Sequence, residues 1–184
     1  MDALTLLTTR RSDKKLSNPV PNKQQLEIIF QAATHVPDHG KLQPYRFIVI
    51  EKPKLAKLAE LLKAAVVELK LDEKRLQKAE KIASIAPMMI AVVAKIDKNI
   101  DKVPGWEQML TAGCSAYAIQ LAANAQGFDN VWLTGPWVDG TELRQALNCQ
   151  KDDKIVSLLM IGTAGEKEAR EPKIVNTADF VSYL

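Results

Sequence analysis

Residues 106–126 decide the fold, and they read WEQMLTAGCSAYAIQLAANAQ. No charged residue occurs from position 110 to position 126, and alanine and other small residues recur throughout. The pattern predicts a helix that is apolar nearly all round, with Gly127 as its C-cap. Such a helix is buried on all sides, so we expect it at the centre of the domain, at a subunit interface, or both.

Four segments around this helix have the composition of β-strands. Residues 87–96, PMMIAVVAKI, form an apolar run that does not alternate, which is typical of a strand buried on both faces. The β-branched and aromatic residues that favour strands recur in three other segments. These are 45–51 (YRFIVIE), 130–134 (NVWLT) and 155–162 (IVSLLMIG).

Helical segments lie between the strands. Asn22 is a suitable N-cap for residues 24–33, and Pro53 favours the start of a helix over 54–70. Further helices are expected over 2–9, 71–83 and 139–147, and the charged segment 71–83 is expected to be mostly solvated. The order α, α, β, α, α, β, α, β, α, β indicates an α+β or α/β fold around one mixed sheet.

Length and composition exclude several classes of protein. A chain of 184 residues, 47% apolar and 26% charged, favours a single globular domain over 1–184. The net charge of +3 is too small to indicate nucleic-acid binding, and no apolar run reaches the roughly 20 residues of a membrane helix. Two cysteines and two histidines favour neither a disulfide framework nor a histidine-based metal site. We expect a cytoplasmic protein with reduced thiols.

Several catalytic motifs are absent from the sequence. It contains no GxGxxG after a strand, no P-loop, no HExxH, no CxxC and no GxSxG. A hydrolase built on a protein nucleophile is therefore disfavoured, whereas nucleotide binding by a fold without these motifs stays open.

The first positive signal is the cluster Arg10, Arg11, Ser12 and Lys14, where a short helix meets a loop. An arginine can bind a phosphate through two parallel hydrogen bonds, a hydroxyl can bind a phosphate oxygen, and a lysine adds a point charge. The cluster therefore indicates a phosphate site. The alternative, which the residues alone favour, is a solvated basic helix end that complements the helix dipole.

Two further segments could present polar groups to a ligand. The loop 37–44, PDHGKLQP, is stiffened by prolines and contains His39, and Gly40 allows a close backbone approach. Residues 127–136, GFDNVWLTGP, combine a tight turn with a strand that ends in Gly-Pro. Each segment also fits an ordinary connection or core strand, and His35 fits a surface or interface position.

Together and in this order, these segments resemble the FMN-dependent nitroreductase family, nearest to its short bacterial NAD(P)H nitroreductase branch, the YdjA type. The resemblance covers almost the whole chain. It rests on the Arg-Arg-Ser cluster, PDHGKLQPYRFIVIE, PMMIAVVAK, KVPGWEQMLTAGCSAYAIQLAANAQGF and KIVSLLMIGT. The QPYRF loop-strand and the helix that begins at Trp106-Glu107 follow the cluster at matching separations, which makes the resemblance specific.

The resemblance implies an α+β nitroreductase-like fold, with a central mixed sheet flanked by helices, in a homodimer. The helix over 106–126 would form much of the dimer interface, FMN would bind at that interface, and the C-terminal tail would reach onto the partner. The FMN contacts that the resemblance implies are Arg10, Arg11 and Ser12 at the phosphate and ribityl chain, His35 and His39 from the other subunit, and Val131, Trp132 and Leu133 beside the ring. Reduced flavin carries negative charge near N1–O2, and Lys14 or Arg11 is the candidate for a cation there.

The resemblance also associates one segment with the nicotinamide nucleotide: Leu121, Ala122, Ala123, Asn124, Ala125 and Gln126. Some positions depart from the family. Leu133 stands where close relatives can carry a basic residue, and the tail lacks a paired-basic phosphate signature, although Lys167, Arg170 and Lys173 are available there.

The implied activity is an NAD(P)H oxidoreductase that passes hydride through flavin N5 to an acceptor such as a nitroaromatic or a quinone, with ping-pong kinetics. Alternatives are another flavin redox reaction on the same fold, an FMN-binding or storage dimer with little turnover, and an α/β interaction domain without flavin. Neither a metal nor nucleic acid is expected as a partner.

Overall fold

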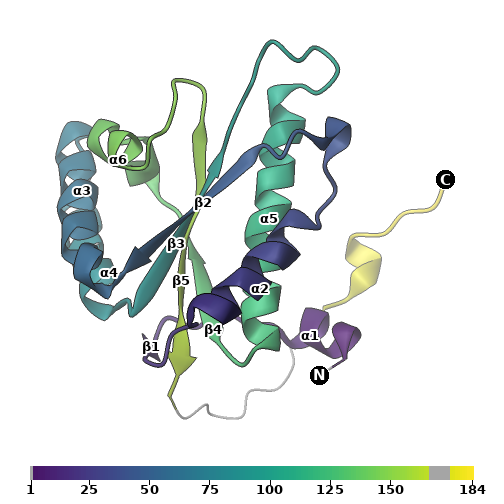
Figure 1. Cartoon of the computed structure of the whole chain (residues 1–184), viewed down its shortest axis with the longest axis horizontal. Helices are drawn as coiled ribbons and strands as arrows, with labels where there is room; N and C mark the ends of the chain where they lie inside the picture. The colour runs from purple at the N-terminus through teal and green to yellow at the C-terminus, as the bar shows by residue number, and fades with distance from the viewer. Residues whose placement is uncertain (1, 166–174) are drawn as a thin grey trace.

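The computed structural model describes residues 2–165 and 175–184. Five strands form one sheet around β5, which pairs with β1, β3 and β4, while β2 pairs with β3 (Figure 1). The strands are β1 Leu16–Ser17, β2 Tyr45–Glu51, β3 Met88–Ala94, β4 Asp129–Leu133 and β5 Lys154–Ala164. All four pairings are antiparallel. The mixed character expected of the sheet is confined, in the described residues, to one parallel bridge between Ser12 and Asn130.

Helices cover both faces of this sheet, so the α+β class is confirmed. In Figure 1, α2 and α5 lie on one side, and α3, α4 and α6 lie on the other. The helices are α1 Ala3–Thr9, α2 Lys23–Thr34, α3 Leu55–Glu68, α4 Glu73–Ile85, α5 Gly105–Ala125 and α6 Thr141–Ala146. Asn22 caps α2 as expected, because its side chain accepts from the Gln25 amide at 2.9 Å.

The sheet separates two apolar cores, and β3 contributes to both. All seven residues of β3 are buried, which confirms the expected strand. Ile90 and Val92 face the core under α2 and α5, whereas Met89, Ala91 and Val93 face the core under α3, α4 and α6. Successive side chains of a strand point to opposite faces, so an apolar run without alternation is the pattern that two cores require.

The long helix α5 is not buried on all sides in the single chain. Its inner face packs on the sheet and includes Ala112, Ala116 and Ile119, none of which is exposed. Its outer face exposes large apolar side chains, with Trp106 61% and Leu110 58% accessible. One chain covers only the inner face of α5, so burial of its outer face at a subunit interface stays a prediction. No helix in the part of the chain described is long and apolar enough to cross a membrane.

Candidate functional site

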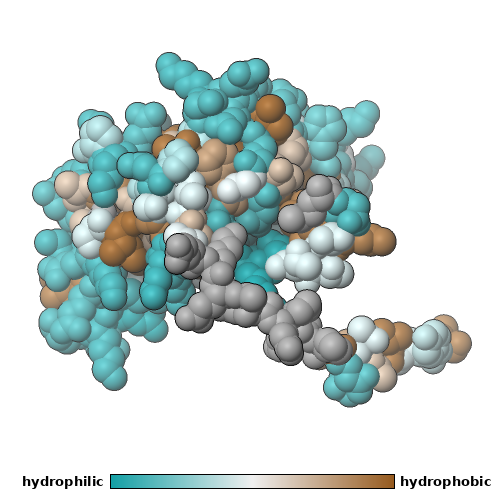
Figure 2. Space-filling model, turned by 90° about the horizontal axis from the view of Figure 1, so that it is seen from below, coloured by the Kyte–Doolittle hydropathy of each residue, from teal (hydrophilic) through white to brown (hydrophobic). Residues whose placement is uncertain are grey.

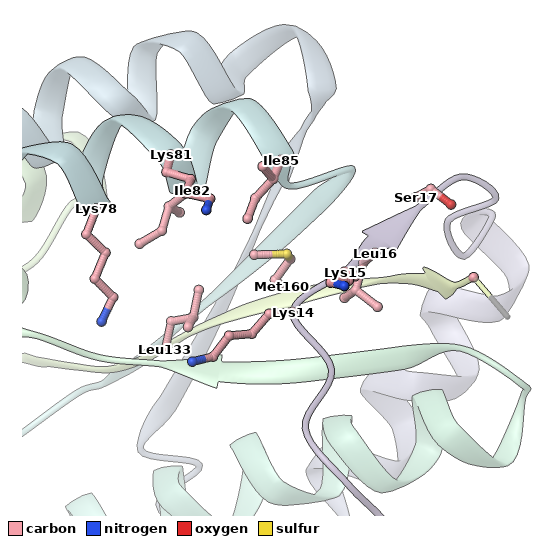
Figure 3. Close-up of a pocket in the computed structure, with 11 residues that line it drawn as sticks. Lys14, Lys15, Leu16, Ser17, Lys78, Lys81, Ile82, Ile85, Leu133 and Met160 are labelled. Atoms are coloured by element: carbon pink, nitrogen blue, oxygen red, sulfur yellow. The ribbon is translucent and has the colours of Figure 1, made fainter. Parts of the chain in front are cut away.

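A pocket of about 780 Å³ lies between α4, the ends of β4 and β5, and the segment that leads into β1 (Figure 3). Its apolar wall comprises Leu16, Ile82, Ile85, Leu133 and Met160. Four lysines, Lys14, Lys15, Lys78 and Lys81, also line it, and none of the described lining residues is acidic. An apolar cavity of this size with a few charged groups of one sign is typical of a site for an anionic small molecule or cofactor.

The N-terminal segment reaches the pocket along the edge of β4. Helix α1 ends at Arg10, whose backbone is no longer helical. Ser12 then bridges Asn130, and the Asp13 amide donates to the Asn130 carbonyl at 3.0 Å. Lys14 follows, and Figure 3 shows its side chain lying beside Leu133. Lys14 and Leu133, which the sequence analysis proposed for one site, are thus brought together.

Arg10, Arg11 and Ser12 precede the pocket rather than line it. Arg10 is half-buried, and Arg11 and Ser12 are exposed. Because Lys14 and Lys15 of the same segment do line the pocket, the Arg-Arg-Ser cluster lies next to it along the chain. The three tail residues Lys167, Arg170 and Lys173 lie outside the described residues.

Helix α4 forms the opposite wall and was missed as part of a site. Lys78, Lys81, Ile82 and Ile85 recur at helical spacing and share one face. The Lys78 ammonium lies 5.5 Å from the centroid of the Trp137 ring, a cation–π contact with a fully buried indole. The lysine-rich composition that led us to expect a mostly solvated segment also supplies these cations. A single sequence does not distinguish a solvated helix from the wall of a pocket, since both place lysines beside isoleucines.

Strand β4 directs its three predicted contact residues to two different faces. Val131 and Leu133 belong to the core under α3, α4 and α6, and Leu133 lines the pocket. The side chain of Trp132 packs instead against the core under α5. This division follows from the period of two along a strand. Trp132 can therefore contribute to the pocket face through its backbone and not through its indole.

His35 and His39 do not line the pocket of their own chain. His35 ends α2, with Nδ1 2.7 Å from the Gln31 carbonyl. His39 Nδ1 lies 2.7 Å from Glu107 Oε2, so the loop and the Trp-Glu start of α5 are joined. Asp38 stiffens the same loop by accepting from the amides of Leu42 and Gln43. The PDHGKLQP loop and the start of α5, which are distant in sequence, thus form one structural unit.

The segment 121–126 also lies away from the pocket, and its polar groups bind within the chain. The Asn124 amide donates to the Phe128 carbonyl at 2.9 Å, and the Gln126 amide donates to the Gln25 carbonyl at 3.1 Å. Ala123 is fully buried. The association of this segment with the nicotinamide nucleotide stays a prediction.

No group of three or more potential metal ligands occurs among the described residues, and Cys114 and Cys149 are free thiols. Burial raises the pKa of the Cys149 thiol, which makes its thiolate scarce. The cations and the apolar wall of the pocket suit the binding of an anionic ligand rather than nucleophilic attack.

Comparison with known proteins identifies the family. The nitroreductase family model matches residues 7–163. The chain is 62% identical to a protein of Haemophilus influenzae and 39% identical to the Escherichia coli K12 protein YdjA, over the full length of both partners in each case; both relatives carry the name "Putative NAD(P)H nitroreductase". A Bacteroides fragilis nitroreductase crystallised with bound FMN shares the fold at 21% identity, with a TM-score of 0.77 over 98% of this chain and 97% of that one. The resemblance read from the motifs is confirmed: the chain belongs to the nitroreductase family.

Proposed function

We propose that this protein is an FMN-dependent NAD(P)H oxidoreductase that works as a homodimer and reduces an acceptor such as a nitroaromatic or a quinone. Its family is one of oxidoreductases, and its two relatives above are named for NAD(P)H. Bound FMN would supply the hydride chemistry, by accepting hydride from NAD(P)H at N5 and passing it to the acceptor. The observation that carries the proposal is the lysine-lined pocket beside the Arg-Arg-Ser segment.

The residues of the pocket fit a flavin. Leu133, Met160 and Ile82 offer apolar surface for a planar ring, and the lysines offer charge for an anionic group. Arg10, Arg11 and Ser12 would bind the phosphate and the ribityl chain, because guanidinium and hydroxyl groups match phosphate oxygens. An acidic lining would have disfavoured the same ligand through like-charge repulsion.

Lys14 and Lys78 would tune the flavin by holding positive charge in the pocket. A fixed cation stabilises negative charge that develops on a bound group, and it needs no reorganisation when the charge appears. The contact of Lys78 with the Trp137 ring supports this role, since it restrains one of the two cations.

The exposed apolar surfaces support the homodimer. The outer face of α5 exposes Trp106, Met109, Leu110 and Tyr117, and α1 has no buried residue in the single chain. Residues 175–184 project from the body with exposed apolar side chains, seen in Figure 2 as brown atoms on an extended arm. A second subunit would cover these surfaces. The pocket lies on the α4 side of the sheet, so the reach of the partner's His35 and His39 to the flavin stays a separate prediction.

Anaerobic reduction of the purified protein by NADH and by NADPH tests the proposal. We expect yellow protein whose oxidised-flavin absorbance disappears with at least one nucleotide and returns when a nitroaromatic or a quinone is added. Steady-state reciprocal plots should be parallel as the acceptor is varied. Retained flavin that neither nucleotide reduces would favour the storage alternative, and protein that binds no FMN would contradict the proposal.

A further inference from the structure

A cluster of buried amides lies between β4 and α5, inside an otherwise apolar core. Asn130 is fully buried, and its Nδ2 donates to the Gln120 carbonyl at 3.0 Å and to Asn124 Oδ1 at 3.2 Å. Its Oδ1 accepts from Gln120 Nε2 at 2.7 Å. Asn124 in turn donates to the Phe128 carbonyl, so the turn around Gly127 is bound into the same cluster.

The backbone of the same residue holds the N-terminal segment. The Asn130 carbonyl accepts from the Asp13 amide at 3.0 Å, and Asn130 forms the parallel bridge with Ser12. Asn130 therefore connects helix α5, strand β4 and the segment that carries Arg10, Ser12 and Lys14. Its side chain faces α5 and its carbonyl faces the segment.

Hydrogen bonds between buried amides specify an alignment that apolar contacts do not. The contacts of Ala123 and Ile119 have little directionality, so a slight shift of β4 along α5 affects them less steeply than it affects hydrogen bonds. A shift would instead leave the amides of Asn130 and Gln120 unpaired in the core, which is unfavourable. Together with the ladder between β4 and β5, the cluster thus holds the Asn130 carbonyl in place, and with it the point where Asp13 docks.

We propose that Asn130 is a positioning residue that acts through β4 on the segment 10–14, and so sets how well this segment binds a phosphate. The second part rests on the proposed function, in which Arg10, Arg11 and Ser12 hold the phosphate of FMN. The positioning of the segment by Asn130 does not rest on the proposed function, since it concerns only the protection of the Asp13 amide from hydrogen exchange.

The test compares Asn130→Leu with Gln108→Leu. Gln108 of α5 is a matched control because it is as buried as Asn130 and also makes three side-chain hydrogen bonds. These join it to the amide and the carbonyl of Asp97 and to the Val103 carbonyl. It lies in the first turn of α5 and has no contact with the N-terminal segment. Both substitutions should lower the Tm.

Two readouts separate positioning from general destabilisation. Hydrogen exchange at the Asp13 amide, followed by NMR on the flavin-loaded protein, should be about tenfold faster in Asn130→Leu than in Gln108→Leu. The preference for FMN over riboflavin, measured by flavin fluorescence titration, should also fall about tenfold in Asn130→Leu alone. Asn124→Ala, which removes one hydrogen bond of the cluster, should give a smaller change in the same direction.

The outcomes are distinct. Equal Asp13 exchange in the two leucine variants would overturn the proposal and leave Asn130 a core residue only. Faster exchange with an unchanged FMN preference would uphold the positioning of the segment and contradict its role at the phosphate, which is part of the proposed function. If Asn130→Leu does not fold, Asn124→Ala decides, and unchanged Asp13 exchange there would equally overturn the inference.

Discussion

Lys14 and Lys78 reach one pocket from opposite walls, and the sequence identified only the first of them. Lys14 follows the Arg-Arg-Ser cluster, whose composition is unusual enough to attract attention. Lys78 lies in a helix with many lysines and glutamates, where a functional cation has the same appearance as a solvated one. At the scale of single residues, function depends on which lysine faces the apolar wall, and packing decides that.

Arg10 provides the first prediction at this scale. Arg10→Ala should weaken FMN binding by about 1.5–3 kcal/mol, the range of a charge-assisted hydrogen bond. Riboflavin lacks the phosphate, so its affinity should change much less. Fluorescence titration with both flavins measures the difference. Equal losses for the two would place the Arg10 guanidinium away from the phosphate.

Lys14 provides the second prediction. Lys14→Met should lower the reduction potential of the bound flavin by roughly 20 mV, because the reduced, anionic form loses an exposed cationic partner worth up to about 1 kcal/mol. Spectroelectrochemistry of the flavin-loaded protein gives the potential. Lys74→Met is the control, since Lys74 belongs to α4 but does not line the pocket. An equal potential in wild type and Lys14→Met would assign the role to Arg11 or Lys78.

At the scale of elements, α6 depends on a neighbouring helix for its N-terminal cap. Gly140 precedes α6 and has no side chain to offer, and Ala65 of α3 fills the space where a larger residue would lie. Glu68 at the end of α3 accepts from the Thr141 amide at 2.8 Å and from its hydroxyl at 2.5 Å. A carboxylate at this position also complements the helix dipole. Two elements far apart in the chain are thereby joined at one residue.

The third prediction follows from this cap. The two hydrogen bonds from Thr141 lower the pKa of Glu68 from its ordinary value of 4.5. A lowered folded-state pKa means that the stabilisation is fully present above the unfolded-state value and is lost as the pH falls through the folded-state value. The Tm of wild type should therefore decrease below about pH 4.5 more than that of Glu68→Gln. Glu60→Gln, on the exposed face of the same helix, should show the same pH dependence of the Tm as wild type. If the Tm of Glu68→Gln has that pH dependence as well, the cap is contradicted.

At the scale of the whole molecule, the distribution of apolar surface supports the proposed homodimer. The sheet takes the inner face of α5, and the outer face, α1 and the C-terminal arm remain uncovered in one chain. A monomer exposing these surfaces together would be prone to aggregate. In the proposed homodimer, a second copy would give the uncharged stretch 110–126 a partner on its outer side as well.

The fourth prediction tests this association. The protein should sediment as a dimer at micromolar concentration, with an interface of well over about 2,000 Å² in total, and Leu110→Lys should shift it toward the monomer. Val67→Lys is the control, because Val67 is equally apolar and 74% exposed but lies on α3, on the opposite side of the sheet. A wild-type monomer that retains FMN, or a Leu110→Lys dimer as tight as wild type, would contradict the proposed interface.

The sequence by itself determined the elements whose signals are local. Three such elements are the helix capped by Asn22, the unbroken apolar run of β3, and the small-residue helix that ends before Gly127. The signal for each depends on neighbours within a few residues or a few turns. The order of these motifs along the chain was also sufficient to predict the family, because a family is recognised from motifs and their separations. The cluster at Arg10 was visible for the same reason.

Only the tertiary structure decided the rest, because the rest depends on contacts between distant segments. Strand pairing made the named ladders antiparallel, and the period of two turned Trp132 away from the face that Leu133 shares with the pocket. Packing of α4 against α3 places Lys78 and Lys81 on the wall of the pocket, across from Leu133 of β4 and Met160 of β5. Asn130 was unremarked in the sequence, since an amide in a strand acquires its meaning only from Gln120, Asn124 and Asp13, which folding brings to it.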